Sequence, residues 1–373
     1  MDNIILTGQQ KDAMRTVIKR LDNRERITTV AGYAGTGKTT LIRYIIEEMN
    51  LMKNTVFVSY TGRASLVLRD RGLPATTIHR LIYETKINKR TGEAIYTKRL
   101  RLNPGIRLIV IDEISMVPER LLRDLASYGI PVIGLGDPFQ LPPVEGNDNG
   151  LLNRPHAFLS EIHRQSKDSE IIFWSMKIRE GEILKPFRGN NVAIIKKEIL
   201  QVESMEAADQ IICGRNATRH NINNYFREEI LKRKSKYPEK GDKLVCTKND
   251  WTAGSRINEI PLINGMIGYA NNNTVIGFNN LFDLYFSPSF NRSDTYSGLR
   301  VSANPFNGKN YNHNRQGVNH FEYGWAITVY KAQGSEFDNV VIFDEVLNRK
   351  NHARQIYTAL TRARINAIIV LED

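Results

Sequence analysis

The sequence contains few cysteines and no long apolar run. Two cysteines, Cys213 and Cys246, occur among its 373 residues. This number is too small for a zinc site or a disulfide framework, so we expect both side chains to be buried reduced thiols. No apolar run approaches the roughly 20 residues that span a bilayer, and the first residues lack the basic and apolar segments of a secretory signal. We therefore expect a cytoplasmic protein without a membrane partner.

Acidic residues are also in deficit. The chain has 40 Asp and Glu against 52 Lys and Arg, which gives a formal net charge of +12 and a pI near 9.5. The basic residues are concentrated at residues 86–107 and 227–243. Such an excess calls for a polyanionic partner, and nucleic acid is the leading candidate. A solvated basic surface is the alternative, and composition does not separate DNA from RNA.

The most informative segment, residues 32–40, matches the pattern G-x-x-x-x-G-K-[ST]. It follows a β-like run at residues 27–31 and precedes a helical pattern at 41–49, which is the context that a phosphate loop needs. Its glycines let successive N–H groups point at phosphate oxygens, and the helix N-terminus adds its positive end. We expect Lys38 to reach the β- and γ-phosphates and Thr39 to hold Mg²⁺. The residues predicted to bind a nucleoside triphosphate here are Gly32, Ala34, Gly35, Thr36, Gly37, Lys38, Thr39 and Thr40.

Three short apolar runs, at residues 55–59, 107–112 and 131–137, each end in a polar or acidic residue. They alternate with helical patterns, which is typical of buried parallel strands in an open α/β sheet. In such sheets, ligand-binding groups collect at the carboxyl ends of the strands. The residues expected to meet at this edge are Thr39, Asp112, Glu113, Asp137 and Gln140.

An acidic pair, Asp112 and Glu113, follows the second of these runs. Beside a phosphate loop, we expect Asp112 to bind Mg²⁺ through water and Glu113 to polarise the attacking water. Gln140, after the third run, could contact the γ-phosphate or that water. The alternative is a solvated glutamine in a proline-rich turn.

A second α/β unit is predicted by similar apolar runs at residues 209–214, 339–343 and 367–371. The length of the chain also suggests about two domains. Within the first half, residues 83–102 alternate around a turn at 90–93, which predicts an inserted β-hairpin.

Residues from about 250 to 320 differ in character from the rest of the chain. They are rich in Asn, Gly and Ser, with strand candidates at residues 266–270, 274–278 and 281–286. We interpret this stretch as a small all-β insertion that contains a loop at 304–319.

Several segments together resemble superfamily 1 helicases of the RecD- and Dda-like 1B branch. The resemblance is clearest in GDPFQLPP at residues 136–143, together with the earlier residues 77–79. Further family motifs are matched, in the family's order, at residues 6–13, 59–64, 159–165, 324–337 and 355–363. Because an ordered set is more specific than any single match, the resemblance covers nearly the whole chain.

The resemblance implies an α/β fold with two RecA-like P-loop NTPase domains that face one another across ATP. Residues 1–165 would form the first domain, with the hairpin at about 83–102 as a strand-separating pin. Residues 166–250 and 321–373 would form the second domain, and residues 251–320 an SH3-like insertion. We expect a monomer.

The resemblance also implies roles in ATP binding and catalysis. Gln10 is expected to recognise adenine and is a better candidate than Gln9. Gln333 and Glu336 would line the nucleotide cleft or relay changes between sites. Arg164 and Arg362 would reach the γ-phosphate, where guanidinium groups stabilise the charge of the transition state. An arginine taken alone is more often in a surface ion pair. The predicted catalytic residues are Lys38, Glu113, Gln140, Arg164 and Arg362.

The predicted DNA contacts lie in motifs that touch the single strand in this family. Hydroxyl and cationic side chains suit phosphate contacts, whereas aromatic side chains stack on bases or pack in the core. Trp325 could likewise stack on a base or pack in the core. A histidine such as His79, taken without its motif, is more often a structural residue. Tyr330 stands where many relatives carry histidine. The residues predicted to bind DNA are Tyr60, Thr61, Arg63, His79, Phe139, Thr328 and Lys331.

These observations predict an ATP-dependent DNA helicase that couples Mg-ATP hydrolysis to unwinding; 5′-to-3′ movement is implied by the resemblance alone. Its expected partners are single-stranded DNA, single-strand/duplex junctions and proteins of replication, recombination or repair. Its expected location is bacterial or virus-infected host cytoplasm, in association with the nucleoid. The alternatives are a DNA-stimulated translocase that does not unwind, and a non-catalytic DNA-binding module with ATP as a ligand. A small-molecule kinase would not need Gln140, Arg164 and Arg362.

Overall fold

The computed structural model describes residues 6–87, 94–143, 146–161, 169–255, 257, 260–307 and 317–372. Its contacts divide the chain into two units. The first comprises Met1–Glu84, Thr97–Asp209 and Gln333–Asp373, and the second comprises Thr85–Tyr96 and Gln210–Ala332. The boundaries of the two RecA-like domains and of the insertion stay a prediction.

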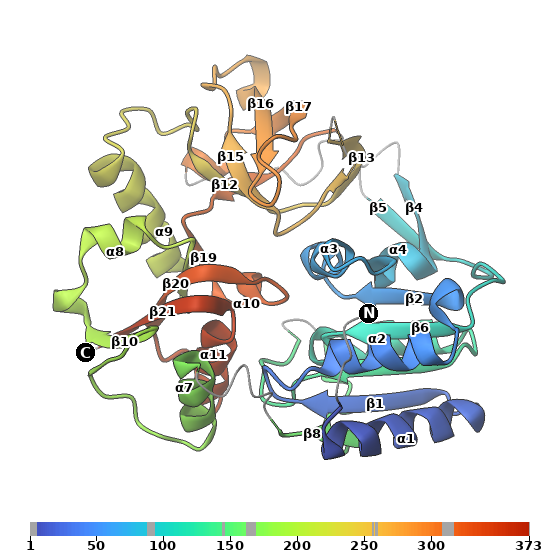
Figure 1. Ribbon diagram of the computed structural model, residues 1–373. Coiled ribbons are helices and arrows are strands. Elements are labelled where there is room, and N and C mark those ends of the chain that lie inside the picture. Colours follow the sequence, from blue (N-terminus) through green and yellow to red (C-terminus); the bar gives the residue numbers. More distant parts are fainter. Residues whose placement is uncertain are drawn as a thin grey trace. The chain divides into compact units, whose positions relative to one another are not determined.

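A six-stranded parallel sheet forms the core of the first unit (Figure 1). Its order is β3-β2-β6-β7-β1-β8, and every pair of neighbouring strands is parallel. The strands are β1 (Ile27–Gly32), β2 (Thr55–Ser59), β3 (Ala75–Thr77), β6 (Leu108–Asp112), β7 (Val132–Gly136) and β8 (Ala157–Leu159). The three predicted apolar runs are therefore confirmed as parallel strands.

Both faces of this sheet are covered. In β6, Leu108 and Val110 join one buried apolar cluster, while Ile109 and Ile111 join another. Because successive side chains of a strand point to opposite faces, a strand buried on both faces is apolar at every position. The first cluster contains α1 (Gly8–Asp22) and α2 (Lys38–Glu48); the second contains α4 (Ile78–Ile82) and α5 (Glu119–Ala126). Each fully buried aliphatic side chain contributes about 1.5–3 kcal/mol.

A second group of strands in the first unit has the order β20-β21-β10-β9. The neighbours β20 and β21, and β21 and β10, are parallel, whereas β9 is antiparallel to β10. The strands are β9 (Phe187–Arg188), β10 (Val192–Lys196), β20 (Phe337–Asp344) and β21 (Ala363–Leu371). The remaining helices of this unit are α3 (Gly62–Asp70), α7 (Glu170–Arg179), α8 (Val202–Glu206) and α11 (His352–Leu360). The predicted runs at 339–343 and 367–371 are confirmed as strands.

The second unit contains a five-stranded antiparallel sheet of order β17-β16-β15-β12-β18. Phe286, Tyr296 and Phe321 are fully buried, and the Phe286 ring contacts the rings of the other two. Its strands are β12 (Lys243–Cys246), β15 (Ile267–Ala270), β16 (Leu281–Pro288), β17 (Tyr296–Ser302) and β18 (Phe321–Tyr323). The other elements are β11 (Gln210–Cys213), β13 (Asp250–Gly254), β14 (Pro261–Leu262), β19 (Ala326–Thr328), α9 (Asn216–Tyr225) and α10 (Val329–Ala332). An all-β segment was expected here; its SH3-like character stays a prediction.

One strand prediction for this segment, at residues 274–278, is wrong. Residues 274–278 form no strand, and the side chains of Val275 and Phe278 are 82% and 91% exposed. A short 3₁₀ turn follows, with Asn279 and Asn280 at φ of 63° and 61°. Left-handed backbone at two successive residues is incompatible with an extended strand, so the chain turns before β16 begins.

The predicted hairpin has two described arms, β4 (Tyr83–Ile87) and β5 (Ala94–Lys98), which form a two-stranded sheet. Its expected turn at residues 90–93 lies outside the described residues. The role of a strand-separating pin stays a prediction.

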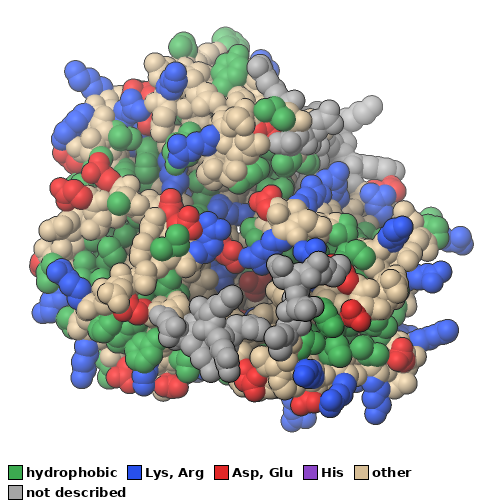
Figure 2. All heavy atoms as spheres, viewed as in Figure 1, with side chains coloured by type: hydrophobic (Ala, Val, Ile, Leu, Met, Phe, Trp, Pro, Cys, Tyr) green, Lys and Arg blue, Asp and Glu red, His purple; other side chains and the backbone are tan. Residues whose placement is uncertain are grey.

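On the face shown in Figure 2, lysine and arginine side chains are spread widely, with acidic side chains between them. Within the described parts of the chain, no helix combines the length and apolar character needed to cross a bilayer.

Candidate functional site

The phosphate-loop segment joins β1 to α2, as its pattern predicts. Gly37, at the start of α2, has φ of 74°, a left-handed conformation that glycine adopts without strain. The Lys38 ammonium group donates to the carbonyl oxygens of Gly32 at 2.8 Å and of Tyr33 at 3.0 Å. The lysine therefore lies within the curl of the loop, where phosphate oxygens would replace these carbonyl groups.

Gln10 supports this loop from α1. Its side chain and the Thr7 side chain form a reciprocal cap at the helix start, with N···O distances of 3.1 and 3.3 Å. The Gln10 amide nitrogen also donates to the carbonyl oxygen of Thr36 at 3.4 Å. Gln9 instead contacts Ser160, with its amide nitrogen 2.8 Å from the hydroxyl. Adenine recognition by Gln10 stays a prediction.

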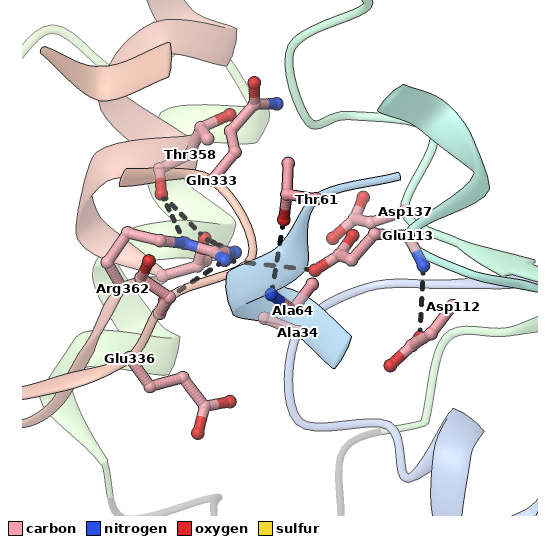
Figure 3. A network of polar contacts seen from close by, with 12 residues as sticks. Ala34, Thr61, Ala64, Asp112, Glu113, Asp137, Gln333, Glu336, Thr358 and Arg362 are labelled. Atoms are coloured by element: carbon pink, nitrogen blue, oxygen red, sulfur yellow. Dashed lines mark hydrogen bonds and ion pairs between the residues drawn. The ribbon is translucent and has the colours of Figure 1, made fainter. Parts of the chain in front are cut away.

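Three carboxylates, those of Asp112, Glu113 and Asp137, lie at the carboxyl ends of the neighbouring strands β6 and β7 (Figure 3). Burial, and then the charge of Glu113, raise the pKa of Asp112 to about 6, against the opposing effect of Lys38. Burial also raises the pKa of Asp137, where Lys38 again opposes the shift. Phosphate loop and acidic residues thus meet at one edge of the sheet, as the strand ends predict.

This edge has the donor set that Mg²⁺ requires. The Asp112 carboxylate and the Thr39 hydroxyl are hard oxygen ligands, and Mg²⁺ usually keeps several waters beside one or two such groups. Burial and, after it, the charge of Glu113 raise the pKa of Asp112, so a cation would lower the free energy of the charged site. The side-chain types of Asp112 and Thr39 suit Mg²⁺, and their role as its ligands stays a prediction.

The raised pKa of Asp112 predicts a pH-dependent stability. Because the folded-state pKa exceeds the unfolded value of 3.8, its stabilising contribution is present below about pH 4 and is lost as the pH rises through about 6. We expect a loss of about 1–3 kcal/mol over this range. Denaturant unfolding at several pH values measures it, and Asp112→Asn should remove this component. Mg²⁺ should restore stability above pH 6, whereas identical pH profiles for wild type and variant would contradict the assignment.

Arg362 lies beside Glu113 and Gln140 in the first unit. One of its terminal nitrogens is 3.8 Å from a Glu113 carboxylate oxygen, and its side chain is only 5% exposed. With the Gln140 amide oriented to satisfy both of its groups, the nitrogen donates to Glu113 at 3.1 Å and the oxygen accepts from Arg362 at 3.1 Å. Three of the predicted catalytic residues therefore form one contiguous polar cluster, and Gln140 is buried rather than solvated.

Two backbone carbonyls fix the position of Arg362. Its Nε donates to the carbonyl oxygen of Thr358 at 3.1 Å, and Nη1 donates to that of Ser335 at 3.4 Å (Figure 3). Such support reduces the freedom of a long side chain, so its guanidinium group is oriented before any ligand binds.

Tyr357, on α11, was not assigned a role from the sequence. Its hydroxyl donates to the Asp137 carboxylate and accepts from the backbone N–H of Ala34 at 3.1 Å. The ring is fully buried and meets Phe139 edge-on, with centroids 5.2 Å apart. Tyr357 thus connects the phosphate loop to Asp137, the residue after β7. No local sequence pattern could have predicted a contact between residues 323 positions apart.

Gln333 and Glu336 occupy different places. The Gln333 amide donates to the carbonyl oxygen of Leu141 at 3.1 Å, next to Gln140 in the chain. One terminal nitrogen of Arg71 donates to both carboxylate oxygens of Glu336, at 3.0 and 2.9 Å. Gln333 therefore contacts the backbone of the residue after Gln140, whereas the Glu336 carboxylate is paired with an arginine. Their predicted roles in nucleotide binding stay predictions.

The predicted DNA contacts of the first unit lie around α3 and α4. Thr61 caps α3 by accepting from the Ala64 N–H at 3.2 Å. The rings of Tyr60 and His79 are 5.9 Å apart. The Arg63 guanidinium group stacks over Phe337 at 4.8 Å, and burial lowers its pKa to about 10. Their contacts with DNA, like that of Phe139, stay predictions.

In the second unit, Thr328 ends β19 and Lys331 belongs to α10. The Lys331 ammonium group is 2.8 Å from the Glu322 carboxylate, which Arg219 also contacts. Burial raises the Glu322 pKa, but these two cations outweigh that effect and lower it. Trp325 stacks on Phe226 with ring centroids 5.8 Å apart, which favours the core-packing alternative for this side chain.

Arg164 lies outside the described residues, so its predicted catalytic role has no structural description.

Two family models match the chain. The model of an AAA domain matches residues 5–193, which is just over half of the sequence. The chain belongs to this family. The model of a UvrD-like helicase C-terminal domain matches residues 323–370. With the relatives that follow, these matches identify the chain as a member of the superfamily 1B helicases, as the motifs predicted.

Several curated relatives are named as helicases. The ATP-dependent DNA helicase Dda of Enterobacteria phage T4 is 35% identical over 194 residues, covering 48% of this chain and 43% of the relative. The ATP-dependent RecD2 DNA helicase of Deinococcus radiodurans is 25% identical over 367 residues, covering 91% of this chain and 46% of the relative. The chain therefore spans less than half the length of these relatives.

Solved structures show the fold. A Pif1 helicase from Bacteroides in complex with ADP-AlF3 and single-stranded DNA matches with a TM-score of 0.56 and 22% identity, covering 100% of this chain and 93% of that one. A Pif1 structure described as a basis for DNA unwinding at forked duplex DNA matches with a TM-score of 0.57 and 21% identity, over 98% and 92% of the two chains. The chain shares the helicase fold of these proteins.

Proposed function

We propose that this protein is an ATP-dependent DNA helicase. The observation that carries the proposal is the cluster of Arg362, Glu113 and Gln140 beside the phosphate loop. A phosphate loop alone serves many nucleotide-binding proteins. A glutamate, a glutamine and an arginine joined at its acidic edge supply a base and a cation for phosphoryl transfer to water.

Each residue of this site has a defined chemical task in the proposed reaction. Glu113 accepts a proton from the attacking water, and Gln140, which is hydrogen-bonded to the Glu113 carboxylate, contacts that water or the γ-phosphate. Lys38 and Arg362 stabilise the negative charge of the transferring phosphoryl group. Mg²⁺ at Asp112 and Thr39 would neutralise charge on the phosphates.

The proposed nucleic-acid substrate is single-stranded DNA and its junction with duplex. The net charge of +12 favours a polyanion, and the named relatives are DNA helicases. Movement in the 5′-to-3′ direction, Mg-ATP coupling and a role in replication, recombination or repair are parts of the proposal. Strand displacement with ATP on duplexes that carry either a 5′ or a 3′ tail tests it. Unwinding from the 5′ tail is expected, and unwinding from the 3′ tail alone would exclude the proposed direction.

The hairpin of β4 and β5 is the proposed strand-separating element. Replacing residues 86–97 with a short glycine turn should reduce unwinding by at least about tenfold. DNA-stimulated ATP hydrolysis should stay within about twofold of wild type, because the residues of the phosphate loop and its acidic edge are unchanged. Both rates are measured on the same forked substrate. Intact unwinding would favour the alternative that the hairpin has no part in separating the strands.

A further inference from the structure

The base of the hairpin, defined here as Ile82, Tyr83, Lys98 and Arg99, is joined to the end of α5. The backbone N–H of Arg99 donates to the carbonyl oxygen of Ile82 at 2.8 Å, which closes the two arms at this point. The Tyr128 hydroxyl lies 2.6 Å from the Arg99 carbonyl oxygen and 3.1 Å from that of Ile82. The single phenol proton is thus shared between carbonyl oxygens of both arms, two residues beyond the end of the helix.

Asp124 holds the side chains of the same base. The Tyr83 hydroxyl donates to one of its carboxylate oxygens at 2.5 Å, and the Lys98 ammonium group is 3.9 Å from the other. Lys98 also donates to the Ser127 hydroxyl and lies 5.1 Å from the centre of the Tyr128 ring. Hydrogen bonds to an ionised group are stronger than neutral ones, so this carboxylate is a firm attachment point.

The helix α5, which carries Asp124 and ends two residues before Tyr128, follows closely after the acidic edge of the site. After Asp112 and Glu113, the chain forms one short turn and enters α5 at Glu119. Leu121, Leu122 and Leu125 of α5 pack in the same buried cluster as Ile111 and Ile114. Because close-packed interiors transmit displacement rather than absorb it, α5 is a rigid spacer from Glu113 to the hairpin base.

We infer that Asp124 and Tyr128 are positioning residues that hold the base of the hairpin in the first unit and thereby determine how efficiently hydrolysis is converted into strand separation. The inference rests on the proposed function. Neither residue touches the predicted nucleotide site, so their loss should change the yield of unwinding per ATP rather than hydrolysis itself.

The test compares Tyr128→Phe, Asp124→Asn and the double variant in the full chain. Tyr225→Phe and Asp12→Asn serve as matched controls, because they remove the same groups from exposed side chains of other helices. The double variant should lower the number of base pairs separated per ATP hydrolysed by at least about fivefold. Its DNA-stimulated hydrolysis should stay within about twofold of wild type, and deuterium uptake should rise in peptides that cover residues 94–99.

The outcomes separate this inference from the proposed function. A wild-type protein that separates no strands overturns both. A wild-type protein that unwinds, with variants of unchanged yield per ATP, overturns the inference alone. Equal losses of hydrolysis and unwinding, together with a lowered melting temperature, would show a purely structural role and also overturn it.

Discussion

Replacing Glu113 with glutamine is expected to lower the rate of ATP hydrolysis by about 10²- to 10⁴-fold, the range that a positioned general base contributes. Glutamine has the same size but does not accept a proton from water. Glu113 has φ of 55°, and both residue types bear the same cost of this left-handed conformation. ATP affinity should therefore stay near the wild-type value, because the phosphate loop is untouched. Steady-state hydrolysis with single-stranded DNA and equilibrium binding of a fluorescent ATP analogue measure the two quantities.

Glu119→Gln is the matched control, since Glu119 is in an i,i+4 ion pair with Arg123 on the exposed side of α5. It should leave hydrolysis unchanged. A Glu113→Gln variant that hydrolyses ATP within threefold of wild type would remove Glu113 from the role of base. It would also support the alternative of a module that uses ATP as a structural ligand, provided that DNA binding persists.

Replacing Arg362 with alanine should lower the turnover number by about 10³- to 10⁵-fold, as expected when an arginine that stabilises the phosphoryl transition state is lost. The Michaelis constant should change far less, because the contribution arises mainly in the transition state. Arg362→Lys should restore little activity. Lysine lacks the planar fork that contacts Glu113 and the carbonyl oxygens of Thr358 and Ser335.

Arg364→Ala is the control for this pair of variants. Arg364 lies two residues away, is exposed and pairs with Asp338 at 2.7 Å. Its loss should not alter turnover measurably, because exposed ion pairs contribute about 0–1 kcal/mol. Melting temperatures must be measured together with the rates, because Arg362→Ala removes a partner of Glu113 and could lower the stability of the fold. Near-normal turnover in a folded Arg362→Ala protein would exclude the proposed role.

Much of the first sheet could be predicted from the sequence because its strands are buried on both faces. In β6, all four residues from Leu108 to Ile111 are apolar, a pattern that only a doubly covered strand requires. The convergence of Asp112 and Lys38 at one edge then follows from parallel strand direction.

Other features depend on contacts that no local pattern encodes. Residues 274–278 have the apolar content of a strand, yet Val275 and Phe278 are exposed and two left-handed asparagines follow them. Tyr357 lies in a recognisable motif, but its bond to the Ala34 N–H depends on the packing of distant elements. In each case the deciding interaction is tertiary, so residue type and spacing do not reveal it.

The eight residues of α5 impose a constraint on how this protein can diverge. Inserting or deleting a single residue in the helix would rotate everything after it by about 100° and shift it by about 1.5 Å. Asp124 and Tyr128 would then face away from the hairpin base while the acidic pair before the helix kept its place. We expect homologous chains to vary the residues on the exposed side of α5 freely, but to keep its length whenever they keep the hairpin.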